Sequence, residues 1–323
     1  MKTTRKALSL LLALCVFLSS VSMTVFGAGA KTIRTPEDLL SLGGQELTGV
    51  IELANDIDMA GYSAEPIKKL VGTFDGKGHE IKNLTLTGSE GERYGNAVYT
   101  ALIGELEGSI VNLSLTDADI STEAQSNTLG TLVGTVRTGV NLIENCTVTG
   151  SVTSTTSAKY PTGDYISGLV GYVFGMSDAP TELTVKNCAV SVNVSGSKND
   201  FVSSAVSYVG AGTVNIENCA FLGDVTADSS AGYAGGIVGQ TTSSAKVIVK
   251  NSYFAGKSSG SKAFSLAFLS STGKYAGNLT YGDNCLYLKN GRQLPNPDAL
   301  SGTAVTGLPV SSDEEALKTP LEG

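Results

Sequence analysis

The sequence predicts an all-β fold, a parallel β-helix (solenoid) of about seven rungs with a short N-terminal capping helix. Two recurring phrases predict it. The first reads "IENCTVTGSV" from Ile143, "VKNCAVSVNV" from Val185 and "IENCAFLGDV" from Ile216. The second reads "GTLVGTV" from Gly130 and "SGLVGYV" from Ser167. The chain also has 39 Gly, abundant Val, Ser and Thr, and no Trp, which is typical of many short strands joined by tight turns.

Residues 1–30 are predicted to be a secretory signal peptide. They have a basic start, an apolar run and a small-residue ending at Ala28, Gly29 and Ala30, after which we expect cleavage. A membrane anchor is the alternative, but the apolar run is shorter than the ~20 residues that a spanning helix needs. The predicted location is therefore extracellular or at the cell surface, with no transmembrane segment after removal of the signal.

Residues 31–48 are predicted to form an N-terminal cap that contains a helix. A β-helix has open ends, which must be covered to prevent strand addition. In "RTPEDLLSLG", Thr35 is a good N-cap, Pro36 suits the first helical position and Asp38 follows three residues after the cap. The side chains expected to cover the first rung are Leu39, Leu40 and Leu42.

Residues 49–290 are predicted to form the β-helix itself, marked by an Asn in each turn. Successive markers are separated by 29, 33, 42, 31, 33 and 33 residues, a period typical of solenoids. Inward-facing residues occupy alternate positions along a strand, and at Asn145 they change from odd to even positions, which indicates a bend. Asn tolerates the left-handed backbone conformation that a bend requires. The markers, expected to stack in one file, are Asn83, Asn112, Asn145, Asn187, Asn218, Asn251 and Asn284.

Two further columns are expected once equivalent residues stack at about 4.8 Å. A small residue follows the Asn and fills the space behind the corner; the cysteines at this place are Cys146, Cys188, Cys219 and Cys285. The second phrase reads as one continuous strand, and its structural glycines are Gly104, Gly134, Gly171 and Gly239. A propeller is the main alternative, but propeller blades are ~40–50 residues long and usually carry aromatic signatures.

The segments "SGLVG" and "GGIVG" resemble the GLUG motif, named for its Gly-Leu-hydrophobic-Gly core. The segment "ELANDIDMAGYSAEPIKKLVGTFDGKGHEIKNLTLTG" resembles the usual opening of such domains, so the resemblance covers about residues 31–290. It implies a right-handed parallel β-helix, in line with the preference for right-handed crossovers. It also implies a secreted or surface protein of bacteria, often found beside adhesive or wall-binding modules. The departures are Ser207 in place of Gly and an unclear copy near "FSLAFLS".

Residues 291–323 read as a turn-rich C-terminal tail, and a truncated end is one interpretation of it. The formal net charge of -8 argues against a nucleic-acid partner, which needs basic surface, and against docking on anionic lipid. We expect a monomer whose partners are glycans or other host or bacterial surface components.

The residue types that carry chemistry are few. Asp56 and Asp58, with Asp75, are weak candidates for a calcium site, although a corner-bonding role is favoured. His79 is the single His, in an opening turn with no metal motif. The four cysteines outside the signal lack metal spacing, and both buried free thiols and disulfides between neighbouring rungs stay open.

We find no column of catalytic residues, so a non-catalytic, adhesin-like module that acts as a spacer or binds glycans is the favoured function. We predict no cofactor. The alternative is a glycan-degrading enzyme, a polysaccharide lyase or glycoside hydrolase, which needs clustered acids with Lys or Arg. Outward tyrosines able to contact sugars are Tyr94, Tyr99, Tyr160, Tyr165, Tyr172 and Tyr233.

Overall fold

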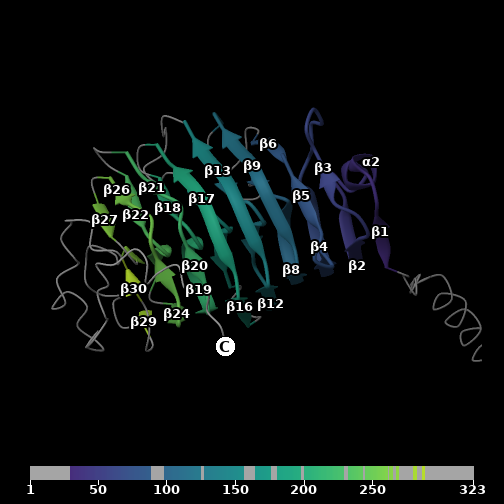
Figure 1. Ribbon diagram of the computed structural model, residues 1–323. Coiled ribbons are helices and arrows are strands. Elements are labelled where there is room, and N and C mark those ends of the chain that lie inside the picture. Colours follow the sequence, from purple (N-terminus) through teal and green to yellow (C-terminus); the bar gives the residue numbers. More distant parts are fainter. Residues whose placement is uncertain are drawn as a thin grey trace, which may run out of the picture.

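A computed structural model describes residues 30–88, 98–124, 127–155, 164–175, 180–197, 200–228, 232–242, 244–260, 262–264, 267–268, 279–281 and 286–287. It is an all-β parallel solenoid, as predicted, in which every strand pairing joins parallel strands from adjacent turns (Figure 1). The predicted signal, the tail, Asn284 and Cys285 lie outside the described residues. Among the described helices, none is long and apolar enough to cross a membrane.

Three parallel sheets form the sides of the solenoid. Sheet A consists of β1 (Lys31–Ile33), β2 (Glu46–Leu53), β4 (Ile67–Asp75), β8 (Ile103–Val111), β11 (Val133–Val136), β12 (Gly139–Glu144), β15 (Val170–Phe174), β16 (Thr181–Lys186), β19 (Val206–Glu217), β23 (Val238–Thr241), β24 (Ala245–Lys250), β28 (Ala267–Phe268) and β29 (Leu279–Tyr281). Sheet B consists of β3 (Ile57–Asp58), β5 (Glu80–Lys82), β6 (Thr85–Gly88), β9 (Ser114–Thr122), β13 (Thr147–Ser154), β17 (Ala189–Ser195), β20 (Ala220–Phe221), β21 (Val225–Thr226), β25 (Tyr253–Phe254), β26 (Ser258–Ser259) and β30 (Leu286–Tyr287). Sheet C consists of β7 (Val98–Thr100), β10 (Asn127–Leu129), β14 (Tyr165–Ser167), β18 (Phe201–Ser203), β22 (Tyr233–Gly235) and β27 (Lys262–Phe264).

Each turn runs through sheet C, then sheet A, then sheet B. The stretch from β7 to β26 makes about five turns with a strand on all three sides, slightly fewer than the seven rungs expected. The difference arises because β2–β3 and β4–β6, within the described residues, supply strands to sheets A and B alone. The last strands, β27 to β30, continue the same three sheets.

The interior is built from aliphatic columns, because equivalent inward positions lie directly over one another. Along β16, residues alternate between buried and partly exposed, the period-two pattern of a strand with one face in the core. One column runs through five successive turns in register, and each member is at most 1% exposed: Ile110, Ile143, Val185, Ile216 and Val249.

The N-terminal end of the solenoid is covered by α2 (Pro36–Leu40), at one end of the rod in Figure 1. Thr35 and Asp38 form a reciprocal capping box at its start, as the sequence predicts. Leu39 and Leu42 are buried in the core and Leu40 packs against it. The short helix therefore seals the first turn with apolar side chains.

Candidate functional site

The corner between sheets A and B carries a file of hydrogen-bonded Asn side chains. In each case Nδ2 donates to Oδ1 of the Asn one turn earlier: Asn145 to Asn112 at 3.1 Å, Asn187 to Asn145 at 3.2 Å, and Asn218 to Asn187 at 3.2 Å. All four have φ between 53° and 55°, and Asn251 follows with φ 45°. Asn suits this corner because it tolerates the left-handed backbone conformation and because its side-chain amide can hydrogen-bond to the amide of another Asn.

The prediction that Asn83 belongs to this file is wrong. The register of β5 against β9 places Asn83 beside Asp117, at a bend within sheet B, where both residues have positive φ. Its Nδ2 donates to Oδ1 of Asp58 at 2.8 Å. The file starts instead at Asp75, whose Oδ1 accepts from Nδ2 of Asn112 at 3.1 Å.

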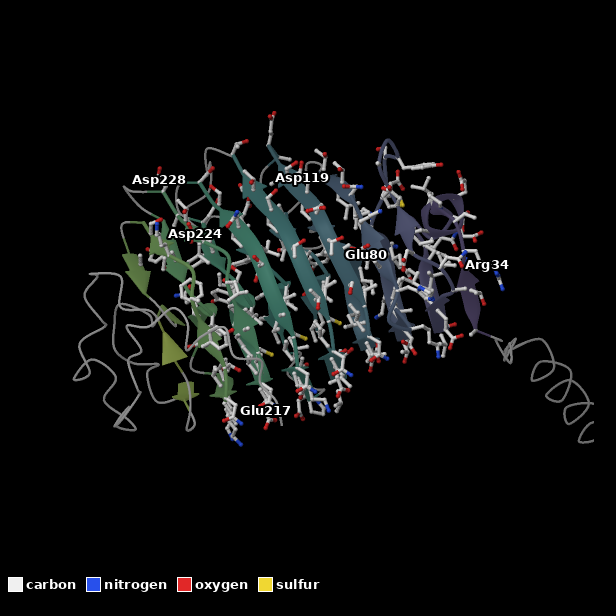
Figure 2. The ribbon with its side chains drawn as sticks, in the orientation of Figure 1. Arg34, Glu80, Asp119, Glu217, Asp224 and Asp228 are labelled. Carbon is white, nitrogen blue, oxygen red and sulfur yellow. The ribbon has the colours of Figure 1, made fainter. Side chains whose placement is uncertain are left out.

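Behind the Asn file lie three buried free thiols, Cys146, Cys188 and Cys219, followed by the buried hydroxyl of Ser252. The sulfur atoms are visible in yellow beside the corner that Glu217 marks in Figure 2. Each cysteine Sγ donates to the carbonyl oxygen two residues earlier, at 3.3, 3.2 and 3.1 Å. Hydrogen bonding with the Cys188 thiol, together with burial, raises the pKa of Cys146, so this thiol stays protonated and is a poor nucleophile.

The three aspartates weighed for calcium occupy different places. Asp56 accepts from a backbone N–H and contacts Nδ1 of His79 at 3.1 Å. Asp58 holds Asn83, and Asp75 forms an ion pair with Lys77 at 3.1 Å. Within the described ranges, no group of three His, Cys, Asp or Glu side chains is arranged to hold a metal ion. Their protein partners favour the corner-bonding role over a cation site.

The glycines of the second phrase line the corner where sheet C meets sheet A, in one column: Gly104, Gly134, Gly171 and Gly239. A Cβ on Gly134 would lie 2.4 Å from Cβ of Tyr99, closer than real contacts allow. Ser207 occupies the same column and is accommodated because its hydroxyl donates to the carbonyl of Phe201 at 2.6 Å. At Gly134 and Gly171 small residues are required because the outward side chains of Tyr99 and Thr128 on sheet C pack over this column.

Outward side chains of sheets C and A create a surface that we call the aromatic corner: Tyr165, Tyr172, Phe174, Phe201, Tyr208 and Tyr233. The ring centroids of Tyr165 on sheet C and Tyr172 on sheet A are 5.0 Å apart, and those of Tyr165 and Tyr208 are 4.7 Å apart. Outward side chains of two sheets can meet only where the sheets form a re-entrant angle. The aromatic corner is therefore a concave outer edge of the solenoid, filled with rings.

The aromatic corner keeps partial access to solvent. Phe174 is 38% exposed, and the four tyrosines are partly exposed, whereas Phe201 is buried. The rings contact one another in stacked, tilted and edge-on arrangements. Burial raises the pKa of Tyr172, which keeps its phenol protonated and able to donate a hydrogen bond.

Towards the N-terminal end of the rod, the same column of sheet A becomes charged. Lys69, Glu105, Thr135 and Tyr172 are in register on successive strands. Lys69 Nζ lies 2.8 Å from a carboxylate oxygen of Glu105 and 3.4 Å from one of Glu107, and the Glu105 hydrogen bond raises the pKa of Lys69. Thr135 is fully buried, and its hydroxyl has no hydrogen-bond partner among the described residues.

Sequence reasoning found part of the aromatic corner. Of the tyrosines singled out, three are members and Tyr99 lies beside it, whereas Tyr94 and Tyr160 lie outside the described residues. The members it missed are Phe174, Phe201 and Tyr208. Phe201 and Tyr208 are in register with Tyr165 and Tyr172, which is the signal that could have found them.

Two buried carboxyl groups lie just before the strands that carry the aromatic corner. Asp164 is 3% exposed and Asp200 is fully buried. The carboxylate of Asp200 accepts from the backbone N–H groups of Asp164 at 2.8 Å and Ser197 at 2.6 Å. Burial, with the neighbouring Asp164 carboxyl, raises the pKa of Asp200 to about 7, although these N–H groups oppose the shift.

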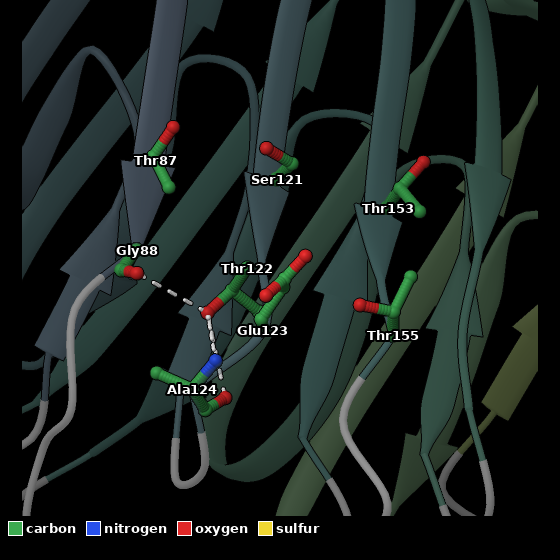
Figure 3. A pocket seen from close by; sticks show the side chains of 8 residues that line it. All are labelled: Thr87, Gly88, Ser121, Thr122, Glu123, Ala124, Thr153 and Thr155. Atoms are coloured by element: carbon green, nitrogen blue, oxygen red, sulfur yellow. Dashed lines mark hydrogen bonds between the residues drawn. The ribbon is translucent and has the colours of Figure 1, made fainter.

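The outer face of sheet B, which bears Asp119 and Asp224 in Figure 2, ends in an open hollow of about 590 Å³ near the corner with sheet C. Figure 3 shows Thr87, Ser121 and Thr153 in a row across three adjacent strands, with Glu123 and Thr155 in a second row. The described residues that line it are Thr87, Gly88, Ser121, Thr122, Glu123, Ala124, Thr153 and Thr155. The sequence analysis did not identify this site.

Comparison with protein families finds no match to this chain. Comparison with curated proteins finds none either. Among solved structures, the chain is similar to a putative immunoglobulin A1 protease from Bacteroides ovatus, with a TM-score of 0.61 and 23% sequence identity over 80% of this chain and 75% of that one. At this identity the likeness shows the fold alone, and the resemblance to GLUG-motif proteins stays a prediction.

Proposed function

We propose that this protein is a secreted, non-catalytic binding module of the GLUG type that holds a glycan or another surface component along the aromatic corner. The observation that carries the proposal is the cluster of six aromatic side chains on the outside of the solenoid, away from its core. Apolar patches on the outer surface of a protein typically mark binding sites.

The chemistry of the aromatic corner suits a ligand with both apolar and hydroxyl faces. Tyrosine supplies a rigid apolar ring together with a phenol that donates and accepts hydrogen bonds. A sugar offers C–H faces and hydroxyl groups in the same way. The flanking carboxylates of Glu105 and Glu107 add hydrogen-bond acceptors at one end. The predicted leader supports an extracellular location, where glycans are abundant.

A glycan-degrading enzyme is the second candidate, and Lys69 with Glu105 and Glu107 is the group that would favour it. A lyase needs a basic residue that can release its charge. The carboxylate of Glu105 favours the protonated form of Lys69, so a base role for this residue is disfavoured. The protease named for the structural neighbour is a third possibility that rests on fold likeness alone.

The test is a glycan array probed with purified residues 31–323, followed by a product assay on each hit. We expect binding without turnover. Replacing the most exposed ring, Phe174→Ala, should weaken binding at least tenfold, whereas Tyr62→Ala, an exposed ring near α2, should leave binding unchanged. Chain cleavage that disappears in Glu105→Gln would overturn the proposal in favour of the enzyme.

A further inference from the structure

The geometry points to a second binding site, the hydroxyl-lined hollow at the end of sheet B, which takes a neutral saccharide through hydrogen bonds. Its volume, about 590 Å³, lies within the range of ordinary small-ligand sites. It spans three turns, because Thr87, Ser121 and Thr153 are in register on β6, β9 and β13. A ligand there would contact three adjacent strands of one sheet.

The hydroxyl groups that line the hollow are available for a ligand. Within the part of the chain that the structure describes, no hydrogen bond engages the side chains of Thr87, Ser121, Thr153 or Thr155. Thr122 differs, because its buried hydroxyl accepts from the backbone N–H of Ala124 at 3.0 Å and so shapes the floor. Each free hydroxyl both donates and accepts, which matches the hydroxyl groups of a sugar.

The charge of the lining selects the chemical class. Among the described residues that line the hollow, Glu123 is the one acidic side chain, and it is exposed in the second row (Figure 3). Its carboxylate can accept from two neighbouring hydroxyls of a sugar but would repel phosphate, sulfate or uronate groups. The described lining residues are mainly hydroxyl-bearing, so they recognise a ligand through the geometry of its hydroxyl groups. A neutral oligosaccharide fits this combination.

This site is separate from the aromatic corner. The hollow is lined by the outer face of sheet B, whereas the aromatic corner joins sheets C and A. The row of hydroxyls also continues beyond the hollow, through Ser195, Thr226 and Ser259 in register. Ser195 supplies the matched control, because it has the same chemistry on the same face and is not among the residues that line the hollow, whereas the hydroxyls of Thr226 and Ser259 are hydrogen-bonded to each other at 3.1 Å.

The experiment measures binding of neutral cello-, manno- and galacto-oligosaccharides to the purified chain by calorimetry, with far-UV circular dichroism as the check on folding. We expect at least one oligosaccharide to bind. Thr153→Val, nearly isosteric, and Glu123→Gln should each weaken its binding about tenfold. Ser195→Ala, in the same row but outside the hollow, should leave binding unchanged.

The outcomes separate this assignment from the proposed function. Binding that Thr153→Val weakens and Phe174→Ala leaves intact supports the hollow alone. Binding that Phe174→Ala abolishes and Thr153→Val leaves intact overturns the hollow and keeps the aromatic corner. Absence of binding by every oligosaccharide, or equal loss in Ser195→Ala and Thr153→Val, also overturns the assignment. If Thr153→Val does not fold, Ser121→Ala provides the same comparison.

Discussion

The side chain of Asn187 donates from Nδ2 to Oδ1 of Asn145 at 3.2 Å, although the two residues are 42 positions apart. The neighbouring step, from Asn187 to Asn218, covers 31 positions and has the same 3.2 Å bond. The corner therefore keeps its geometry whatever the length of the turn between two Asn residues. Stacked amides and left-handed backbone together set the register of the solenoid.

The first prediction concerns this file. Asn145→Ala should lower the free energy of unfolding by about 2–3 kcal/mol, because it loses amide hydrogen bonds to two neighbours and strains a backbone with φ 54°. Asn145→Gly removes the bonds without the strain, so its loss should be about half as large. Urea unfolding followed by circular dichroism measures both. Equal losses would show that backbone strain contributes nothing at this corner.

The second prediction concerns the glycine column beside the aromatic corner. Gly134→Ala should destabilise the fold by roughly 1–3 kcal/mol, because the new methyl would overlap Cβ of Tyr99 and the carbonyl oxygen of Gly104, 2.7 Å away. Ser207→Gly, at the equivalent position, should cost about 1 kcal/mol for its lost hydrogen bond. Thermal unfolding compares the two. An unchanged melting temperature for Gly134→Ala would contradict the tight packing described here.

The third prediction is a pH dependence set by Asp200. Its pKa is about 7 in the folded protein against an ordinary value of 3.8, so the folded state holds this proton more tightly than the unfolded state. Its contribution to stability is therefore greatest at low pH, falls as the pH rises from about 4 to about 7, and is constant above that. The change should be on the order of a few kcal/mol.

The measurement compares wild type with Asp200→Asn in urea between pH 4 and pH 8. Wild type also carries carboxylates with lowered pKa values, such as Asp75, which act in the opposite direction. The difference between the two proteins isolates Asp200, and it should move in favour of Asp200→Asn as the pH rises. A difference that is independent of pH would show that Asp200 stays ionised throughout.

The fourth prediction concerns the buried thiols. Cys146, Cys188 and Cys219 should resist alkylation by iodoacetamide in the native protein at pH 8 and react fully in guanidinium, because they are buried and the pKa of Cys188 is about 12. Peptide mass spectrometry resolves each site, and the unfolded sample is the control. Detection of a disulfide between any two of them before reduction would refute the free-thiol arrangement.

Much of the fold could be predicted from the sequence because a solenoid repeats its constraints. Asn145, Asn187 and Asn218 each mark a corner. The repeated sequence around them shows which residues of the strands on either side face the core. Asn83 was misplaced because its local sequence, "IKNLTL", looks like the later corners, whereas it lies at a different bend of sheet B. Only the pairing of β5 with β9 reveals this.

The candidate sites were harder to predict. Alternation shows that Tyr165 and Tyr172 point outward, but it carries no information on the angle between two sheets, so their 5.0 Å contact was not foreseeable. The pair of Asp164 and Asp200 precedes short strands in segments that read as loops, which hid their burial. The hollow was missed because Thr87, Ser121 and Thr153 are common surface residues that gain meaning only when stacked.

The connections from sheet B to sheet C differ in length from turn to turn, with no change in the pairing that follows them. β9 ends at Thr122 and β10 begins at Asn127, whereas β13 ends at Ser154 and β14 begins at Tyr165, yet β10 and β14 pair in register. Foreign peptides grafted into these connections should be displayed at chosen heights along the rod. The solenoid thus offers a scaffold with regularly spaced insertion points, at which epitopes or enzymes would be separated by multiples of the distance between neighbouring strands.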